Sequence, residues 1–212
     1  SDVCSSDLAM RIGFPDYKVR TVSVNGRTLP DTLRALEQYE IKGEITDKDG
    51  NKLTNFNGDV YPVIYDKIQT IRTLGNDPGK SQPKDFAIQN SVLFKGKTKA
   101  VNGDFSFSFI VPKDINYSFG NGLLSYFAHD GKKSAAANDA NIIVGGINPN
   151  PASDITGPQI RAFLNNENFV NGGIVNQTPL LILKLFDSSG INSAGAGVGH
   201  DISAMIDDDP NQ

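Results

Sequence analysis

The chain has 212 residues, a formal net charge of −4 and a pI near 5.1. This length allows one or two domains, and the acidic balance argues against a nucleic-acid binder, which needs a basic face. The single cysteine, Cys4, excludes an internal disulfide and a zinc site built from several thiolates. No apolar run in the sequence is long enough to cross a membrane as a helix.

The first predicted elements follow from hydrophobic periodicity. Alternation over residues 20–24 predicts a strand, and Asn25-Gly26 predicts the tight turn that ends it. Residues 31–38 carry the one helical pattern, with Asp31 as the cap and an apolar stripe at helical spacing, so we expect a helix of about two turns there. Alternation returns over residues 39–46 and predicts the next strand.

The clearest strand signal lies at residues 104–111, entered through the turn dipeptide Asn102-Gly103. Strict alternation sends Phe105, Phe107 and Phe109 to one face and the intervening serines to the other. This pattern is typical of a half-buried antiparallel strand. Further strands are predicted at residues 60–66, 67–74, 86–94, 97–101, 123–128 and 141–144.

The spacing of these segments predicts the domain organisation. Turn signals recur about every 8 to 12 residues, which favours an all-β, immunoglobulin-like β-sandwich at residues 17–147. A proline-containing linker follows at 148–156. Residues 157–212 then contain predicted strands at 160–164, 180–186 and 201–206. Since such a sandwich needs about 100 residues, we expect a partial second Ig-like β domain there.

Two clusters of oxygen ligands raise the question of calcium. Asp47, Asp49 and Asn51 have the spacing that opens a calcium-binding loop, but the twelfth position of such a loop is Gly58 instead of Glu. An Asp-Gly hairpin turn is the favoured interpretation. Residues 207–209 are three aspartates that could hold calcium or form a solvated loop. We therefore predict no metal or cofactor site for the chain itself.

The sequence also predicts no catalytic residue. His200 precedes Asp201, but adjacent residues of a strand point to opposite faces, so direct pairing of these side chains is not expected. His129 ends a predicted strand at a turn, and no serine lies in a nucleophile-elbow context. The glycine-rich residues 192–199 are followed by strand-like alternation, which favours a loop between strands over a phosphate-binding turn.

The N-terminus differs from the rest of the chain. Residues 1–8, SDVCSSDL, resemble a translated sequencing adapter, and we expect them to be foreign to the protein. A natural polar tail is the alternative. If these residues are foreign, Cys4 is foreign as well.

Several segments, taken in order, resemble one family. They are residues 31–36 (DTLRAL), 43–47 (GEITD), 102–117 (NGDFSFSFIVPKDINY), 120–128 (GNGLLSYFA), 156–161 (TGPQIR), 168–173 (NFVNGG), 187–192 (DSSGIN) and 197–202 (GVGHDI). Together they resemble the β region that follows the catalytic domain in the PorU family of type IX secretion sortases, gingipain-type cysteine peptidases of the Bacteroidetes. Residues 9–15 are similar to the end of the peptidase domain, although Leu8 replaces the family's proline.

The resemblance implies a non-catalytic fragment. In the family, the active-site His and Cys lie upstream in a caspase-like domain, whose end would fall within residues 1–16 here. The parent would be a peptidase at the outer membrane and cell surface, which removes C-terminal sorting domains from secreted cargo and joins the cargo to an anionic lipopolysaccharide. This fragment would act as a scaffold and docking module, with the peptidase domain, cargo proteins and other secretion-system components as partners.

Two alternatives belong to other classes of protein. A free-standing surface adhesin or glycan-binding module would expose aromatic rings, but Tyr61, Tyr65, Phe107 and Tyr126 occupy alternating positions that are typical of a core. A hydrolase in its own right would use His200 and would show peptidase activity that is lost on its replacement.

Overall fold

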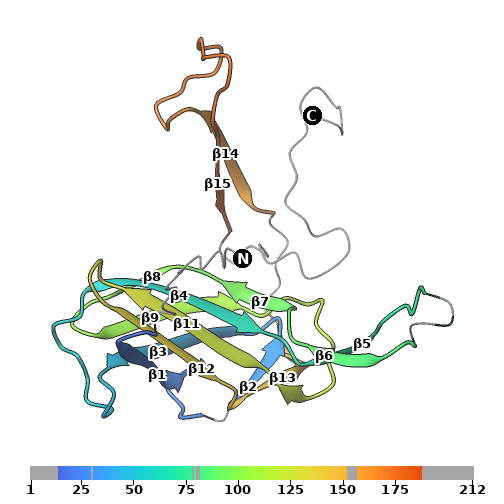
Figure 1. Ribbon diagram of the computed structural model, residues 1–212. Coiled ribbons are helices and arrows are strands. Elements are labelled where there is room, and N and C mark those ends of the chain that lie inside the picture. The colour runs from blue at the N-terminus through green and yellow to red at the C-terminus, as the bar shows by residue number, and fades with distance from the viewer. Residues whose placement is uncertain (1–13, 30, 78, 80–81, 152–156, 188–212) are drawn as a thin grey trace, which may run out of the picture.

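The computed structural model describes residues 14–29, 31–77, 79, 82–151 and 157–187. These residues form strands, turns and no helix, which confirms the predicted all-β fold (Figure 1). The strands are β1 (Tyr17–Val24), β2 (Asp31–Ala35), β3 (Gln38–Thr46), β4 (Gly58–Tyr65), β5 (Gln69–Arg72), β6 (Asp85–Ile88), β7 (Val92–Lys95), β8 (Thr98–Ala100), β9 (Asp104–Ile110), β10 (Gly120–Asn121), β11 (Leu123–His129), β12 (Ser134–Asp139), β13 (Ile142–Ile147), β14 (Gln159–Leu164) and β15 (Leu181–Phe186).

Eight strands form one sheet that closes over the main core. Its order is β7-β4-β11-β12-β1-β3-β9, with β8 also paired to β4. The rings of Phe94 on β7 and Phe109 on β9 lie 5.1 Å apart, centroid to centroid. Because β7 and β9 stand at opposite ends of the sheet, this contact brings the two ends together, and the sheet folds into the two layers of a β-sandwich.

A smaller sheet of β10, β13 and β2 completes the body. Leu33 on β2 and Ile142 and Val144 on β13 are fully buried in the same apolar cluster as the large sheet. The sandwich therefore has one continuous core, as a domain of this size requires.

The aromatic strand β9 has the predicted alternation. Phe105 and Phe109 are buried, Phe107 is half-buried and stacks on Phe94, and the two serines are exposed. β9 pairs with β3 so that Phe105 lies opposite Gly43, where an added Cβ would approach the Phe105 ring to 2.3 Å. Glycine thus leaves the space that this ring fills in the core.

The helix predicted at residues 31–38 is wrong. β2 forms there instead and pairs in parallel with β13, with Leu33 and Ala35 fully buried. Leu36 follows with a φ of 60° and turns the chain into β3. The strand prevails because β13 supplies backbone partners and the core accepts alternate side chains, so tertiary contacts override a weak helical preference.

Among the described residues, the remaining predicted strands are present. The strand expected at residues 86–94 is two separate strands, β6 and β7. β12 was not expected, because its sequence SAAAND lacks the β-branched and aromatic residues that mark strands. β14 and β15 match two strands of the second module, whereas residues 1–8 and 201–206 lie outside the described residues. The domain boundaries stay a prediction.

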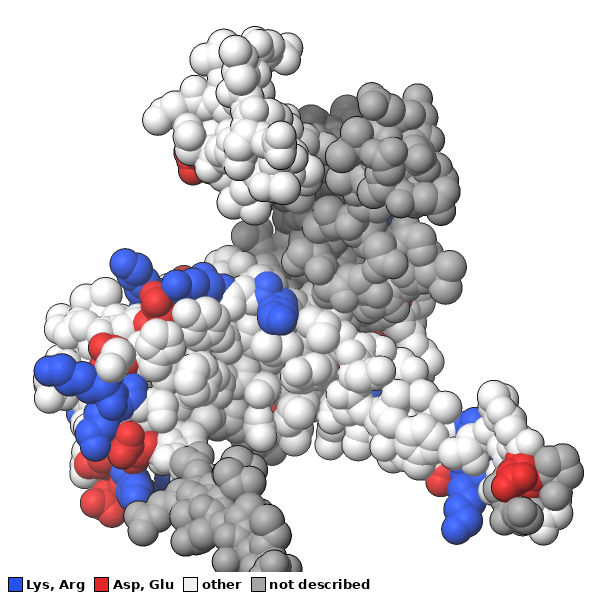
Figure 2. Space-filling view, turned by 45° about the horizontal axis from the view of Figure 1, so that its top comes forward, with Lys and Arg blue, Asp and Glu red and all other residues white. Residues whose placement is uncertain are grey.

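Two ribbons leave the sandwich. β5 and β6 form a two-stranded arm at one end, and β14 and β15 form a separate hairpin (Figure 1). Charged side chains gather at one end of the sandwich and on the arm, with largely uncharged surface between them (Figure 2).

Candidate functional site

A cluster of ring side chains lies on the outer face of β4 and β11. These antiparallel strands pair Tyr61 with Phe127 and Asp59 with His129. Side chains alternate across a sheet, and the neighbours that point inward, such as Val60 and Ala128, are fully buried. The outer side chains therefore remain accessible, and Phe127 is 47% exposed.

The three rings lie in mutual contact. The Tyr61 ring centroid is 6.3 Å from that of Phe127 and 5.7 Å from that of His129, and Phe127 and His129 are 6.0 Å apart. The Tyr61 hydroxyl lies 3.5 Å from His129 Nε2. Cross-strand contacts of this kind stabilise a sheet, so the rings are held in place on rigid strands.

A lysine and an aspartate complete the cluster. Lys97 Nζ lies 5.4 Å from the centre of the Tyr61 ring and 2.9 Å from Asp59 Oδ2. The hydrogen bond from Lys97 lowers the pKa of Asp59, and the nearby charges of Lys97, His129 and Lys99 lower it further. The same hydrogen bond with Asp59 raises the pKa of Lys97. The hydrogen bond between Lys97 and the Tyr61 hydroxyl raises it by a smaller amount. Both side chains are therefore charged at neutral pH.

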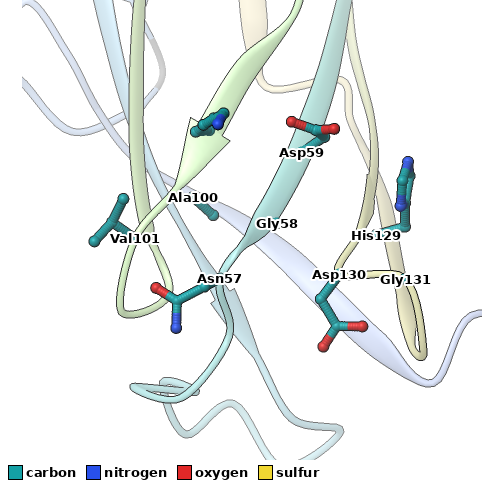
Figure 3. A pocket seen from close by; sticks show the side chains of 9 residues that line it. Asn57, Gly58, Asp59, Ala100, Val101, His129, Asp130 and Gly131 are labelled. Carbon is teal, nitrogen blue, oxygen red and sulfur yellow. The ribbon is translucent and has the colours of Figure 1, made fainter.

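A shallow pocket of 430 Å³ adjoins this cluster (Figure 3). Its lining residues are Asn57, Gly58, Asp59, Lys99, Ala100, Val101, His129, Asp130 and Gly131. Figure 3 shows the Asp59 and His129 side chains on neighbouring strands, and Asn57 and Asp130 near the turns. Backbone N–H groups of Lys133 and Lys132 donate to the Asp130 carboxylate and lower its pKa.

Gly58 sets the close approach of β4 to the end of β11. A Cβ at this position would lie 2.2 Å from the carbonyl oxygen of His129. No side chain fits there without separating the strands. Gly58 therefore helps to bring Asp59 and His129 together at the pocket.

The calcium candidates lie elsewhere, in the turn after β3. Asp47 Oδ1 accepts hydrogen bonds from the backbone N–H groups of Asp49 at 2.9 Å and Asn51 at 2.8 Å. Asn51 Nδ2 donates to Asp47 Oδ2 at 3.0 Å, and this bond is the main cause of the lowered pKa of Asp47. The described residues contain no group of three or more His, Cys, Asp or Glu side chains arranged to hold a metal ion. The expectation that these residues form a turn and no metal site stays an untested prediction as far as calcium is concerned.

Of the aromatic residues expected in the core, Tyr126 is buried there, while Tyr61 and Tyr65 are half-buried on the outer face of β4. The sequence did not indicate the cluster, because Tyr61, Lys97 and Phe127 come from distant segments. Cys4, residues 192–199, His200 and residues 207–209 lie outside the described residues.

Solved structures similar to this chain include a secretion-system protein. The chain is 33% identical to latent, dimeric PorU from Porphyromonas gingivalis, with a TM-score of 0.64 over 91% of this chain. This match confirms the resemblance to the C-terminal region of PorU. The chain spans 18% of the PorU chain.

Other comparisons add little. The sporulation control protein Spo0M from Bacillus subtilis is 16% identical, with a TM-score of 0.35 over 64% of this chain and 51% of Spo0M. A β-glucosidase from Listeria innocua is 15% identical, with a TM-score of 0.26 over 63% of this chain and 16% of the enzyme. Both similarities are too low to support an argument. No family model matches the sequence, and no curated protein matches it.

Proposed function

We propose that this chain is the non-catalytic β region of a type IX secretion sortase and serves its parent enzyme as a scaffold and docking module. The match to PorU over 91% of the chain carries this proposal. In this proposal, the catalytic His and Cys belong to a caspase-like domain elsewhere in the parent, which works on the extracellular side of the outer membrane. Among the described residues, no helix is long and apolar enough to span a membrane.

The arm formed by β5 and β6 supports a docking role. Ile71 and Phe86 face each other across the arm and are 39% and 45% exposed, while Arg72 and Asp85 form an ion pair on the opposite face. A two-stranded ribbon is marginally stable in water, and exposed apolar surface marks interaction sites. We propose that the apolar face of the arm packs against the peptidase domain of the parent.

The gene upstream of Ala9 tests the identity of the parent. We expect it to encode a caspase-like domain that contains a catalytic His and Cys. An upstream reading frame without such a domain contradicts the proposal. The purified chain itself is expected to cleave no peptide substrate, and peptidase activity that disappears in His200→Ala would favour the hydrolase alternative.

The docking role is tested by binding of the purified chain to the separately expressed peptidase domain. Titration calorimetry should show a complex that Ile71→Ser and Phe86→Ser each weaken by about tenfold or more, since buried apolar contacts dominate such interfaces. Phe127→Ala is the matched control, because Phe127 is equally exposed but lies on β11. Equal weakening by all three substitutions would contradict docking through the arm.

A further inference from the structure

We propose that Asn171, in the loop that joins β14 to β15, is a site of spontaneous covalent modification, at which the side-chain amide is lost and aspartate or isoaspartate is left. The reaction needs no enzyme, because the attacking group is the backbone nitrogen of Gly172 and the co-reactant is water. The inference rests on local geometry and is independent of the proposed docking role.

The chain contains five Asn-Gly dipeptides, which begin at Asn25, Asn57, Asn102, Asn121 and Asn171. Glycine favours this reaction because it has no Cβ to shield the backbone nitrogen. The sequence alone therefore gives these sites equal rank. Since the reaction joins the asparagine Cγ to the glycine nitrogen, the structure ranks the sites by how firmly these two groups are held.

In two of the dipeptides, the glycine nitrogen is already engaged within the sandwich. The Gly103 N–H donates to the carbonyl oxygen of Phe56 at 2.9 Å, and the Gly122 N–H donates to that of Ile142 at 2.9 Å. Both glycines are buried. The nitrogen has to leave its acceptor before it can attack, so the structure protects these sites.

In two others, the asparagine side chain is held. Asn25 Oδ1 accepts from the N–H of Glu40 at 2.7 Å, and Asn25 Nδ2 donates to the carbonyl oxygen of Gln38 at 3.2 Å. Asn57 Oδ1 accepts from the N–H of Asn102 at 3.0 Å. These bonds restrict the side-chain rotation that brings Cγ to the following nitrogen.

Asn171 has neither restraint. With Gly172 it forms the centre of an exposed turn, which the Gly173 N–H closes by donating to the carbonyl oxygen of Val170 at 2.9 Å. The loop lies at the outer end of the β14–β15 hairpin (Figure 1). Among the described residues, nothing is hydrogen-bonded to the Asn171 side chain or to the Gly172 N–H. Gly172 has a φ of 83°, which glycine adopts freely, and no atom lies within 4 Å of where its Cβ would be.

The reaction has two balanced steps. First, a bond forms between the Gly172 nitrogen and Asn171 Cγ, the Cγ–Nδ2 bond breaks, and the amide leaves as ammonia with the proton that the Gly172 nitrogen loses. Water then opens the cyclic imide at either carbonyl and gives aspartate or isoaspartate. Both products add a negative charge at neutral pH, beside Val170 and Ile174, which are exposed. Isoaspartate also lengthens the backbone of the turn by a carbon atom.

The experiment follows the purified chain in mildly alkaline buffer by peptide mapping and mass spectrometry, which locate each lost amide. In the folded chain, Asn171 should react about tenfold or more faster than any other Asn-Gly site, because a hydrogen bond has to open first at the others. The same chain in concentrated urea is the matched control. There the hydrogen bonds are lost, and all of the Asn-Gly sites should react at similar rates.

Asn25 gives the sharpest comparison within the folded chain. Gly26 is also exposed with open space around it, but the Asn25 amide is held at both ends. An Asn25 that reacts as fast as Asn171 would overturn the proposal. So would a rate at Asn171 that is far lower in the folded chain than in urea.

Asn171→Gln provides a second measurement. It should remove the first acidic form that anion-exchange chromatography resolves from the ageing protein, and it should leave the other Asn-Gly sites unchanged. An acidic form that persists at the same rate in this variant would assign the early reaction to another residue and contradict the proposal. None of these results bears on the identity of the parent enzyme.

Discussion

The sandwich and the β14–β15 hairpin both contain strands rich in apolar residues, but these apolar side chains are buried in the sandwich and largely exposed in the hairpin. In β3, Tyr39, Ile41 and Ile45 are 2% exposed or less. In β15, whose sequence is LILKLF, Leu181 is 46% exposed and Phe186 is 66% exposed. β3 pairs with β9 and β14 pairs with β15 in an unbroken antiparallel register. The difference therefore lies in what packs against the strands.

This comparison separates two determinants of a β structure. Alternating residues and a pairing partner are enough for a strand, but burial needs a second layer. The sandwich has that layer because its large sheet folds back on itself and the β10-β13-β2 sheet joins the same core. Among the described residues, the hairpin forms a sheet of two strands only. We therefore expect it to open far more readily than the sandwich.

The largest expected effect comes from a core ring. Phe105 is 4% exposed and contacts Tyr126 edge-on at 5.7 Å, so Phe105→Ala should lower the free energy of unfolding by about 3–5 kcal/mol. Leu183 on β15 is 39% exposed, and Leu183→Ala should lower the free energy of unfolding by only about 0.5 kcal/mol. Urea denaturation measures both. Similar losses of stability for the two variants would show that side chains of the hairpin pack in the same core as Phe105.

The same distinction explains which parts of the fold could be predicted from the sequence. Phe105, Phe107 and Phe109 alternate with serines, so both the strand and its buried face were predictable. Residues 31–35 were not, because Leu33 and Ala35 fit a helix as well as a strand until β13 supplies a partner. The half-burial of Phe107 also depends on where Phe94 lies, which local sequence does not specify.

The candidate site was less predictable than the fold. In β4 the sequence VYPVIY has apolar or aromatic residues on both faces, so alternation alone does not say which face is buried. Pairing with β11 decides, and it puts Val60, Pro62 and Ile64 inward and Tyr61 outward. Lys97 and His129 come from other segments, and only the register of the sheet brings them to Tyr61.

The second-largest effect on stability is expected at Gly58, where the backbones of β4 and β11 lie close together. Gly58→Ala should separate β4 from the end of β11, because the new Cβ would meet the His129 carbonyl, and it should destabilise the protein by about 1–3 kcal/mol. Gly157, just before β14, has no atom within 4 Å of such a Cβ. Gly157→Ala should therefore be neutral or slightly stabilising. Thermal melts of the two variants compare the regions directly, and equal destabilisation would contradict the difference in packing.

A smaller effect is expected at a buried hydroxyl. Burial raises the pKa of Tyr126 from 10.0 to about 12, and its hydroxyl lies 3.0 Å from Thr21 Oγ1. Because the pKa of Tyr126 is raised in the folded protein, the protonated hydroxyl contributes to stability. This contribution is complete below pH 10 and is lost as the pH rises toward 12. Tyr126→Phe should cost about 1 kcal/mol at neutral pH and should lose less stability than the wild type between pH 10 and pH 12. Parallel alkaline profiles for the two proteins would show that Tyr126 does not ionise in this way.

The smallest effect should lie in the hairpin. Lys184 on β15 forms an ion pair with Glu167, and their side chains are 50% and 58% exposed. Exposed pairs contribute only about 0–1 kcal/mol, so Lys184→Ala should leave global unfolding unchanged. Hydrogen exchange of the β14–β15 amides is the sensitive measurement, since it reports local opening. We expect these amides to exchange much faster than those of β3, and Lys184→Ala to change their opening free energy by about 0.5 kcal/mol at most. If the hairpin amides instead matched β3 and lost protection only on global unfolding, the two regions would form one cooperative unit, and exposure of the β15 side chains would not be a measure of its stability.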